Sequence, residues 1–390
     1  MRDPLPVSSL GERRYFPAAD VLRVLCIFTV AWFHIWQQSW LDPSFTLGGH
    51  YFDLQRIVRR GYMLVDLTLL LTGYLLYQPL VRSSGRLDAA KFYRRRLCRI
   101  LPCYLLAVFA AAIFAIARGR SLGSAPLWRD LLTHLTFTHT FSMDTYYWTS
   151  LNAALWTVAI EMQFYLIFPL LARAFGKAPY LTASLMTLAA LLCRWGVSRL
   201  PEISLYFTQL PCMLDLYALG MLAAYLSERR ADAPRRWVFL PLALLALFGV
   251  FAVLWAQNPT DDRALKTAQM VWRLPLGVCG AAFLYFAARS PELLRGAAAR
   301  PLRFLSAISY NYYMWHQYLA VKLKEFHIPA YTTEMPQMYE GREWQTKYTL
   351  LCFFAAFVLA AALTYLVEKP AGRALLRLGR KAESTAKTEN

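Results

Sequence analysis

Long apolar segments recur along the whole chain, and they restrict what it can fold into more than any other feature. Many approach the length, roughly 20 residues, that a helix needs to cross the hydrocarbon core of a bilayer. Of the 390 residues, 57% are hydrophobic and only 17% are charged. An ordinary soluble domain is about half apolar and about a quarter charged. The sequence therefore predicts an all-α, polytopic membrane protein.

About ten segments have the length and composition of spanning helices. They cover residues 18–36, 63–81, 100–117, 152–171, 180–197, 208–226, 237–255, 267–288, 304–323 and 348–367. No small-residue cleavage site follows the first segment, so we expect it to remain as a helix. The predicted division is an N-terminal segment at 1–17, a transmembrane domain at 18–368 and a tail at 369–390.

Basic residues are distributed unevenly between the two sides of this predicted bundle. With the N-terminus inside, the inner segments hold 26 of the 42 Lys and Arg residues, the outer loops hold 13, and the helices hold 3. Because cytoplasmic loops collect Lys and Arg, both termini are predicted to be cytoplasmic. This topology accounts for the formal net charge of +18. Membrane lipid, and no nucleic acid, is therefore the expected partner.

Three ionisable residues interrupt the first apolar segment. Arg23 and His34 are eleven positions apart, almost three helical turns, so both project from one face of a helix, and Asp20 shares that face. Lipid cannot solvate such a stripe, which must face other helices or a watery cavity. Each residue is therefore a functional candidate. The alternative for His34 is a position at the interfacial end of the helix, where water reaches it.

The fourth predicted helix carries a carboxylate inside the membrane. Glu161 lies within it, and Tyr165 follows one helical turn later. A buried carboxylate needs a cation, a proton or a network of hydrogen bonds. We expect Arg23 or His34 to be its partner.

Two further helices carry polar groups of possible function. The second contains Asp66 and Thr72, and Gly73 beside them allows another helix to approach closely. The ninth carries a second polar stripe of residues spaced three apart, namely Tyr310, Tyr313 and His316.

The first inner loop is strongly basic. It holds seven Lys or Arg residues between positions 82 and 99, against the single acid Asp88. Arg96 and Arg99 lie one turn apart as the chain enters the third helix, with Arg95 beside them. Guanidinium groups bind phosphate bidentately, so the loop is a candidate site for a nucleotide-like anion. Anchoring to anionic lipid is the alternative.

No pattern in the sequence indicates a metal site. The seven cysteines lie in or beside apolar segments, and no CxxC spacing occurs. Such cysteines have the character of small buried hydrophobes. We therefore expect neither a bound metal nor a disulfide framework.

These segments, in this order, resemble the acyltransferase 3 family of integral membrane O-acyltransferases, over about residues 15–373. In the first helix, this family has an Arg followed, after ten intervening residues, by a His, and Arg23 and His34 match this pattern. The second helix reads VDLTLLLTGYLL, in which Thr72 replaces the usual Ser. The entry to the third helix matches an RRxxRxxPxY pattern through Arg95, Arg96, Arg99, Pro102 and Tyr104, and the segment WTVAIEMQFY supplies Trp156, Glu161, Gln163, Phe164 and Tyr165. The YxxYxWH pattern is carried by Tyr310, Tyr313, Trp315 and His316. The closing EKP is Glu368, Lys369 and Pro370.

The resemblance implies acyl transfer, usually of acetyl from acetyl-CoA, to a hydroxyl of an extracytoplasmic or lipid-linked carbohydrate. It also implies a location in the cytoplasmic (inner) membrane of a bacterium. Some members of the family carry a fused extracytoplasmic esterase-like domain. This chain ends soon after the tenth predicted helix, so we expect direct delivery to the acceptor or a separate extracytoplasmic partner.

Acyl transfer from a thioester to an alcohol requires a base and a site that stabilises the oxyanion. His34 is the predicted base because imidazole titrates near neutrality, and His316 is its rival. Glu161 or Asp20 would orient His34 or balance its charge. Arg23 would bind the donor or stabilise the oxyanion.

At the cytosolic face, Arg95, Arg96 and Arg99 would hold the phosphates of coenzyme A. The pantetheine arm would then pass between helices toward His34. The alternative hypothesis is a protein of another class, namely a transporter or flippase of a lipid-linked saccharide in which buried charges relay protons. The absence of duplicated halves in the sequence speaks against it, and coenzyme A binding would separate the two. If the protein is an acyltransferase, the transferred group could also be succinyl or a longer acyl group, since the motifs do not distinguish these from acetyl.

Overall fold

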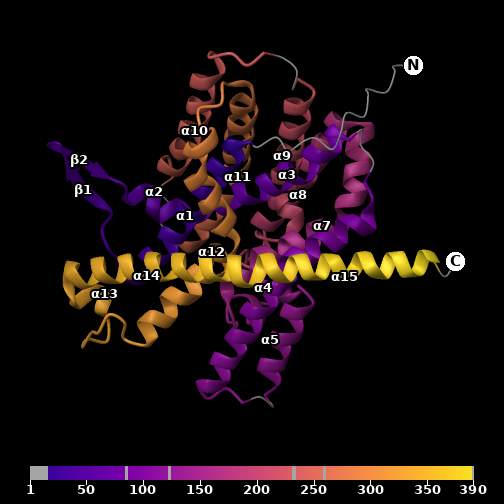
Figure 1. Cartoon of the computed structure of the whole chain (residues 1–390). Coiled ribbons are helices and arrows are strands. Elements are labelled where there is room, and N and C mark those ends of the chain that lie inside the picture. Colours follow the sequence, from indigo (N-terminus) through magenta and orange to yellow (C-terminus); the bar gives the residue numbers. More distant parts are fainter. Residues whose placement is uncertain (1–15, 84–86, 122–123, 231–233, 258–260, 389–390) are drawn as a thin grey trace, which may run out of the picture.

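The described chain is mainly helical, as the sequence predicts, and its only strands form one short hairpin (Figure 1). The structure is a computed structural model, and it describes residues 16–83, 87–121, 124–230, 234–257 and 261–388. Most of the predicted N-terminal segment at 1–17 lies outside these residues.

Each of the ten predicted spans corresponds to a helix. The ten are α1 (Pro17–Ser39), α3 (Val65–Arg82), α4 (Ala89–Ala117), α7 (Trp156–Lys177), α8 (Pro179–Ser198), α9 (Leu214–Glu228), α10 (Phe239–Trp255), α11 (Asp262–Arg289), α12 (Arg300–Glu325) and α14 (Gly341–Leu363). In the described parts, eight helical segments are long and apolar enough to cross a membrane. The other two are α10, which has 17 residues, and α12, which carries many polar side chains.

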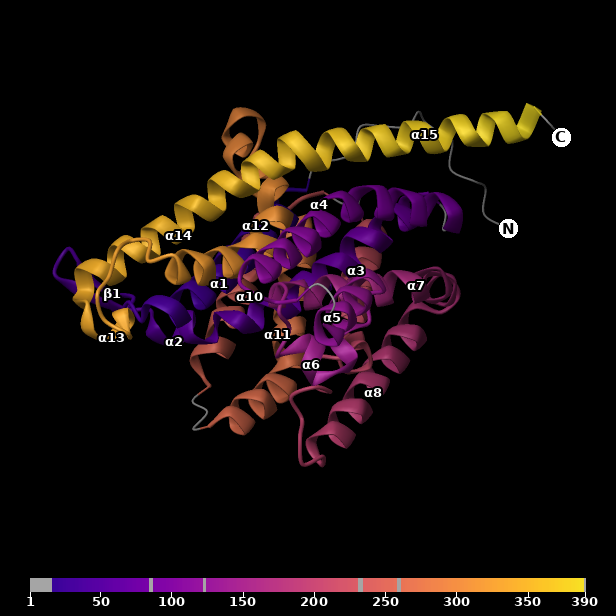
Figure 2. The ribbon, with the colours of Figure 1, turned by 90° about the horizontal axis from the view of Figure 1, so that it is seen from below.

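Shorter helices fill the connections between these ten. They are α2 (Gln55–Arg60), η1 (Gly61–Leu64), α5 (Ala125–Leu135), η2 (His139–Phe141), α6 (Met143–Tyr146), η3 (Ala153–Leu155), η4 (Leu210–Met213), η5 (Gly296–Ala299) and α13 (Pro336–Tyr339). At the C-terminal end, the π-helical turn η6 (Thr364–Glu368) joins α14 to α15 (Lys369–Thr388). Figures 1 and 2 show α14 and α15 as one rod along one side of the molecule.

A short β-hairpin follows α1, and the sequence analysis does not anticipate it. Strands β1 (Ser44–Leu47) and β2 (His50–Asp53) pair antiparallel from end to end. Gly48 and Gly49 form the turn with φ of 58° and 79°, left-handed values that glycine adopts without a steric penalty. The hairpin lies near α13 at one end of the molecule (Figures 1 and 2), where Arg342 donates a hydrogen bond of 3.2 Å to a β1 carbonyl.

Helices α3 and α9 touch backbone to backbone. Gly73 of α3 faces the backbone of Tyr217, and Gly220 of α9 faces the backbone of Leu70. A Cβ atom added at either glycine would overlap a carbonyl oxygen of the other helix. The close helix approach predicted at Gly73 is therefore confirmed, and small residues make it possible as in other membrane bundles.

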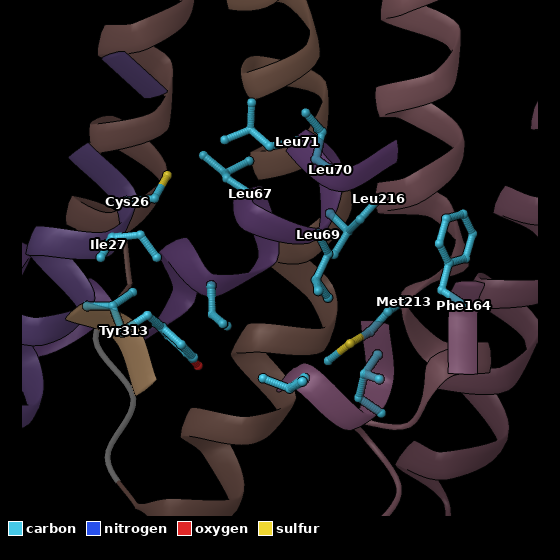
Figure 3. Packing of buried hydrophobic residues seen from close by; sticks show 14 of the residues in the cluster. Cys26, Ile27, Leu67, Leu69, Leu70, Leu71, Phe164, Met213, Leu216 and Tyr313 are labelled. Atoms are coloured by element: carbon cyan, nitrogen blue, oxygen red, sulfur yellow. The ribbon is translucent and has the colours of Figure 1, made fainter. Parts of the chain in front are cut away.

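Apolar side chains from several helices interlock around this crossing. Figure 3 shows them meeting in the interior of the bundle. Most come from α1, α3, α7, α9 and α12, and the labelled set is Cys26, Ile27, Leu67, Leu69, Leu70, Leu71, Phe164, Met213, Leu216 and Tyr313. This packing fixes the positions of α1 and α12, which also contact each other directly.

Replacing Gly220 by Ala is expected to destabilise the protein by about 3 kcal/mol, because neither helix backbone can move aside for the new methyl group. Thermal unfolding of the purified protein in detergent measures this loss. The matched control is Gly196→Ala in α8, where an added Cβ meets nothing within 4 Å. We expect this control to be neutral or slightly stabilising. Equal unfolding temperatures for the two variants would contradict the close crossing.

Candidate functional site

His34 of α1 and His316 of α12 face each other across the contact between these two helices. Their ring centroids are 5.3 Å apart, and the ring planes are inclined by 45°. His316 is 1% exposed, whereas His34 is only partly buried. The sequence offers the two residues as rival bases, and the structure brings them into one site, which we call the histidine pair.

Hydrogen bonds define which nitrogen of each ring carries a proton. Nδ1 of His316 lies 2.6 Å from the Tyr313 carbonyl oxygen and 3.2 Å from that of Tyr312. Nδ1 of His34 lies 3.0 Å from the amide oxygen of Gln37. These oxygens only accept hydrogen bonds, so in each neutral ring Nδ1 carries the proton and Nε2 carries the lone pair. Nε2 of His316 is buried and has no hydrogen-bond partner in the described part of the chain.

The predicted polar stripe of α12 divides between two tasks. The ring centroid of Tyr313 lies 5.5 Å from that of His316, so Tyr313 lies beside the histidine pair. The hydroxyl of Tyr310 instead donates to the carbonyl of Ile100 in α4, at 3.3 Å. Tyr310 therefore holds α12 against α4.

Asp20 and Arg23 form a second cluster near the start of α1. Nη1 of Arg23 lies 3.6 Å from Oδ1 of Asp20 and donates a hydrogen bond of 2.9 Å to the hydroxyl of Ser306. Ser306 in turn donates to Asp20. Arg23 is about 16 Å from His34 along the helix axis, at about 1.5 Å per residue. The structure therefore brings neither Asp20 nor Arg23 to the histidine pair. A lone serine gives little signal, and sequence reasoning missed Ser306.

Two hydroxyl groups donate hydrogen bonds to the carboxylate of Glu161. Thr72 of α3 donates to one carboxylate oxygen at 2.8 Å, and Tyr165 donates to the other at 3.1 Å. The structure thus differs from the expected ion pair with Arg23 or His34, which the described residues do not form. The physical reason is that Arg23 is already engaged by Asp20, while Thr72 faces Glu161 from the neighbouring helix.

The predicted basic residues lie on the first turns of α4. The guanidinium of Arg96 lies 5.8 Å from the centre of the Tyr165 ring, which connects it to the Glu161 cluster. Arg99 approaches Glu368 at 3.8 Å. Arg95 is exposed. These arginines therefore form a cationic surface next to the polar interior of the bundle.

Asn311 is a buried polar residue that the sequence analysis overlooked. It donates to Glu368 at 2.8 Å and to the hydroxyl of Thr364 at 2.9 Å. Both acceptors lie in the π-helical turn η6, and such turns are frequent at functional sites. An amide in the middle of a membrane helix was the signal available. The closing EKP motif is thereby tied to the helix that carries His316.

Asp66 lies in a buried ion pair with Arg273, at 3.0 Å, and both residues are fully buried. A second pair, Arg194 with Asp215 at 2.7 Å, lies close by. Both guanidinium groups also donate to the carbonyl of Cys212. The two pairs thereby join α3, α8, α9 and α11, and Asp66 contacts no member of the histidine pair. Its contacts support a role in packing.

The segment around α5 covers the start of α7. The rings of His134 and His139 stack with centroids 3.9 Å apart, and burial lowers the pKa of His134 to about 4, which keeps it neutral. Asp130 accepts a hydrogen bond of 2.7 Å from the Ser150 backbone, while burial raises the pKa of its carboxyl. These contacts fix the loop that precedes η3. Across the residues that the structure describes, no group of three or more His, Cys, Asp or Glu is arranged to hold a metal.

The family model described as "Acyltransferase domain" matches residues 16–369, which is nearly the whole chain. This chain belongs to the acyltransferase 3 family. The family resemblance predicted from the sequence is thus confirmed, and the apolar helices make this family member a multi-pass membrane protein.

Curated relatives carry related names. "Putative acetyltransferase ORF330" of Acidianus two-tailed virus is 26% identical over 78% of this chain and 83% of its own length. "Putative peptidoglycan O-acetyltransferase YrhL" of Bacillus subtilis is 28% identical over 41% of this chain, and "O-acetyltransferase OatA" of Staphylococcus aureus is 25% identical over 40%. The match covers 24% of the length of each of these two proteins. No solved structure matches significantly.

In this acyltransferase, Arg273→Met is expected to lower the free energy of unfolding by about 3–5 kcal/mol, because it leaves Asp66 charged and unpaired. The double variant with Asp66→Leu should recover part of that loss, since neither charge then remains alone. Unfolding in detergent measures both effects. The control is Lys347→Ala, which breaks the exposed pair with Glu343 and should cost less than about 1 kcal/mol. A double variant as unstable as the sum of its two single variants would refute the pairing.

Proposed function

We propose that this protein transfers an acetyl group from cytosolic acetyl-CoA to a hydroxyl of an extracytoplasmic or lipid-linked carbohydrate. Membership of the family supports acyl transfer. The names of two relatives support an O-acetyl product, and one of them includes peptidoglycan. The single observation that carries the mechanism is the histidine pair, in which hydrogen bonds leave Nε2 of each neutral ring able to accept a proton.

His34 is the proposed general base. We assign the acceptor hydroxyl to His34 because its side chain is only partly buried, whereas His316 is 1% exposed. The hydroxyl proton passes to Nε2 of His34 while the hydroxyl oxygen bonds to the thioester carbonyl carbon. The C–S bond then breaks, and the thiolate of coenzyme A takes the proton from the imidazolium. The products are the acetyl ester and free coenzyme A, and the imidazole returns to its neutral form.

Tyr312 is the proposed donor to the oxyanion. Its hydroxyl is buried and has no hydrogen-bond partner among the described residues. Its ring is parallel to that of His316, with the centroids 6.3 Å apart. An unoccupied donor in a water-poor site stabilises developing negative charge more effectively than one in water. Sequence reasoning named its neighbours Tyr310 and Tyr313 and missed Tyr312.

The donor is proposed to enter from the cytosolic face. Arg95, Arg96 and Arg99 would bind the phosphates of coenzyme A, as guanidinium groups bind phosphate bidentately. Arg23 lies about 16 Å from His34 along α1, so we assign it to the path of the pantetheine arm and not to the oxyanion. Glu161 and Tyr165 lie beside Arg96 and would line the same path.

His34→Ala is expected to lower kcat about a thousandfold, because a general base contributes roughly 10²–10⁴ to the rate. Release of coenzyme A by the protein in lipid vesicles, with a glycan acceptor present, measures this effect. Binding of acetyl-CoA should be unchanged. His50→Ala, in the exposed hairpin, is the matched control and should keep full activity. A His34→Ala protein that retains most of its activity would exclude His34 as the base.

Arg96→Ala is expected to weaken acetyl-CoA binding about tenfold, because it removes a charge-assisted contact to phosphate. Equilibrium binding of acetyl-CoA measures the change, with the exposed Arg377→Ala in α15 as the control. If the wild type neither binds nor consumes any acyl-CoA, even with glycan acceptors present, the acyltransferase proposal fails. A transporter of a lipid-linked saccharide would then be the better explanation.

A further inference from the structure

A pocket of about 420 Å³ lies where α4 and α12 end, beside the loop that precedes η3. This volume falls within the usual range for small-molecule sites, about 300–1,000 Å³. Its polar and charged lining residues include Arg118, Arg120, Asn152, Gln317, Tyr318 and Lys322. In the predicted topology this end of the bundle faces outward, away from the basic surface of α4.

The charges that line the pocket are mainly positive. Lys322 pairs with Glu325 at 2.8 Å, and both line the pocket. Arg118 and Arg120 form no ion pair or side-chain hydrogen bond with the described residues. The carboxylate of Asp130 is close enough to attract Arg120 electrostatically, but the hydrogen bond that it accepts comes from the Ser150 backbone. Two guanidinium groups therefore remain available to a ligand.

The backbone fixes where these two arginines lie. Gly119, between them, has φ of 91°, a left-handed value that terminates α4. The Arg120 amide donates to the Ala115 carbonyl at 3.0 Å, and the Gly119 amide donates to that of Ile116 at 2.9 Å. This pair of bonds is a Schellman motif, a rigid ending for a helix. Arg118 and Arg120 are thus held at the pocket by the end of α4.

The pocket and the histidine pair share helix α12, although neither histidine lines the pocket. Gln317 and Tyr318 line it and directly follow His316. Asn152, in the opposite wall, donates a hydrogen bond of 2.7 Å to the Met314 carbonyl, which ties that wall to the same turn of α12. The hydroxyl of Tyr318 is buried and has no partner among the described residues. The pocket therefore offers a polar group from the helix that carries His316.

We propose that this pocket is the acceptor site and that it selects a saccharide bearing a carboxylate, bound by Arg118 and Arg120. This inference rests on the proposed acetyl transfer and names the class of its acceptor. Guanidinium forks match a carboxylate in charge and geometry, and the polar groups of the remaining walls suit sugar hydroxyls. The phosphate of a lipid-linked sugar shares this chemistry, so the experiment separates the two.

The test compares three acceptors with the wild-type protein in vesicles. They are a neutral disaccharide of N-acetylglucosamine, the same disaccharide with a lactyl carboxylate on one ring, and the neutral disaccharide carrying a 1-phosphate. We expect kcat/KM for the carboxylate acceptor to exceed that for the neutral one at least tenfold. In Arg118→Gln/Arg120→Gln this preference should disappear, because KM for the carboxylate acceptor rises to that for the neutral one. Arg199→Gln, which removes an exposed arginine stacked on Trp195, is the matched control.

Three results would overturn the pocket proposal. They are equal use of the neutral and carboxylate acceptors, a preference that survives in the double variant, and a preference for the 1-phosphate alone. If no acceptor is acetylated at all, equilibrium dialysis of the labelled carboxylate disaccharide decides the matter separately. Binding that requires Arg118 and Arg120 would support the pocket while the proposed reaction fails, and equal binding to both proteins would refute the pocket as well.

Discussion

Lipid cannot solvate the polar face of α1, and the arrangement of the bundle follows from this constraint. Within the hydrocarbon core an ionisable side chain must find its partner in the protein. Helix α12 supplies those partners, since Ser306 engages Asp20 and Arg23 at one end, while His316 lies opposite His34 toward the other. A helix that carries so many polar groups must itself avoid lipid. This explains why α12 is less apolar than most of its neighbours and contributes many buried residues.

The other half of the bundle is organised by close packing and by paired charges. The glycines of α3 and α9 let two backbones touch, which excludes both lipid and water from the crossing. Beside it, two buried arginines pair with two aspartates and also satisfy backbone carbonyls around η4. Breaking a single such pair is costly, so this region has few alternative arrangements. It forms a rigid frame against which α1 and α12 are positioned.

Polar groups follow one another from one end of the bundle to the other. The arginines of α4 adjoin the Glu161 cluster through Tyr165, and the Asp20–Arg23–Ser306 cluster lies on the face of α1 that also carries His34. Beyond the histidine pair, α12 continues into the wall of the pocket that Arg118 and Arg120 line. In the proposed reaction, a donor bound at one end and an acceptor bound at the other react at the histidine pair. Such an arrangement suits a reaction whose two substrates come from opposite sides of a membrane.

The sequence by itself determined the helical class, the positions of the ten long helices and the family, because each depends on local composition, on apolar length or on short motifs. It also identified the residues of the polar stripes. It did not determine which polar side chains pair with one another. Only the tertiary structure decided that Glu161 takes hydroxyl partners, that Asp66 belongs to Arg273, and that the two rival histidines share one site. Helical periodicity defines the face on which a side chain lies, but the packing of distant helices chooses what that face meets.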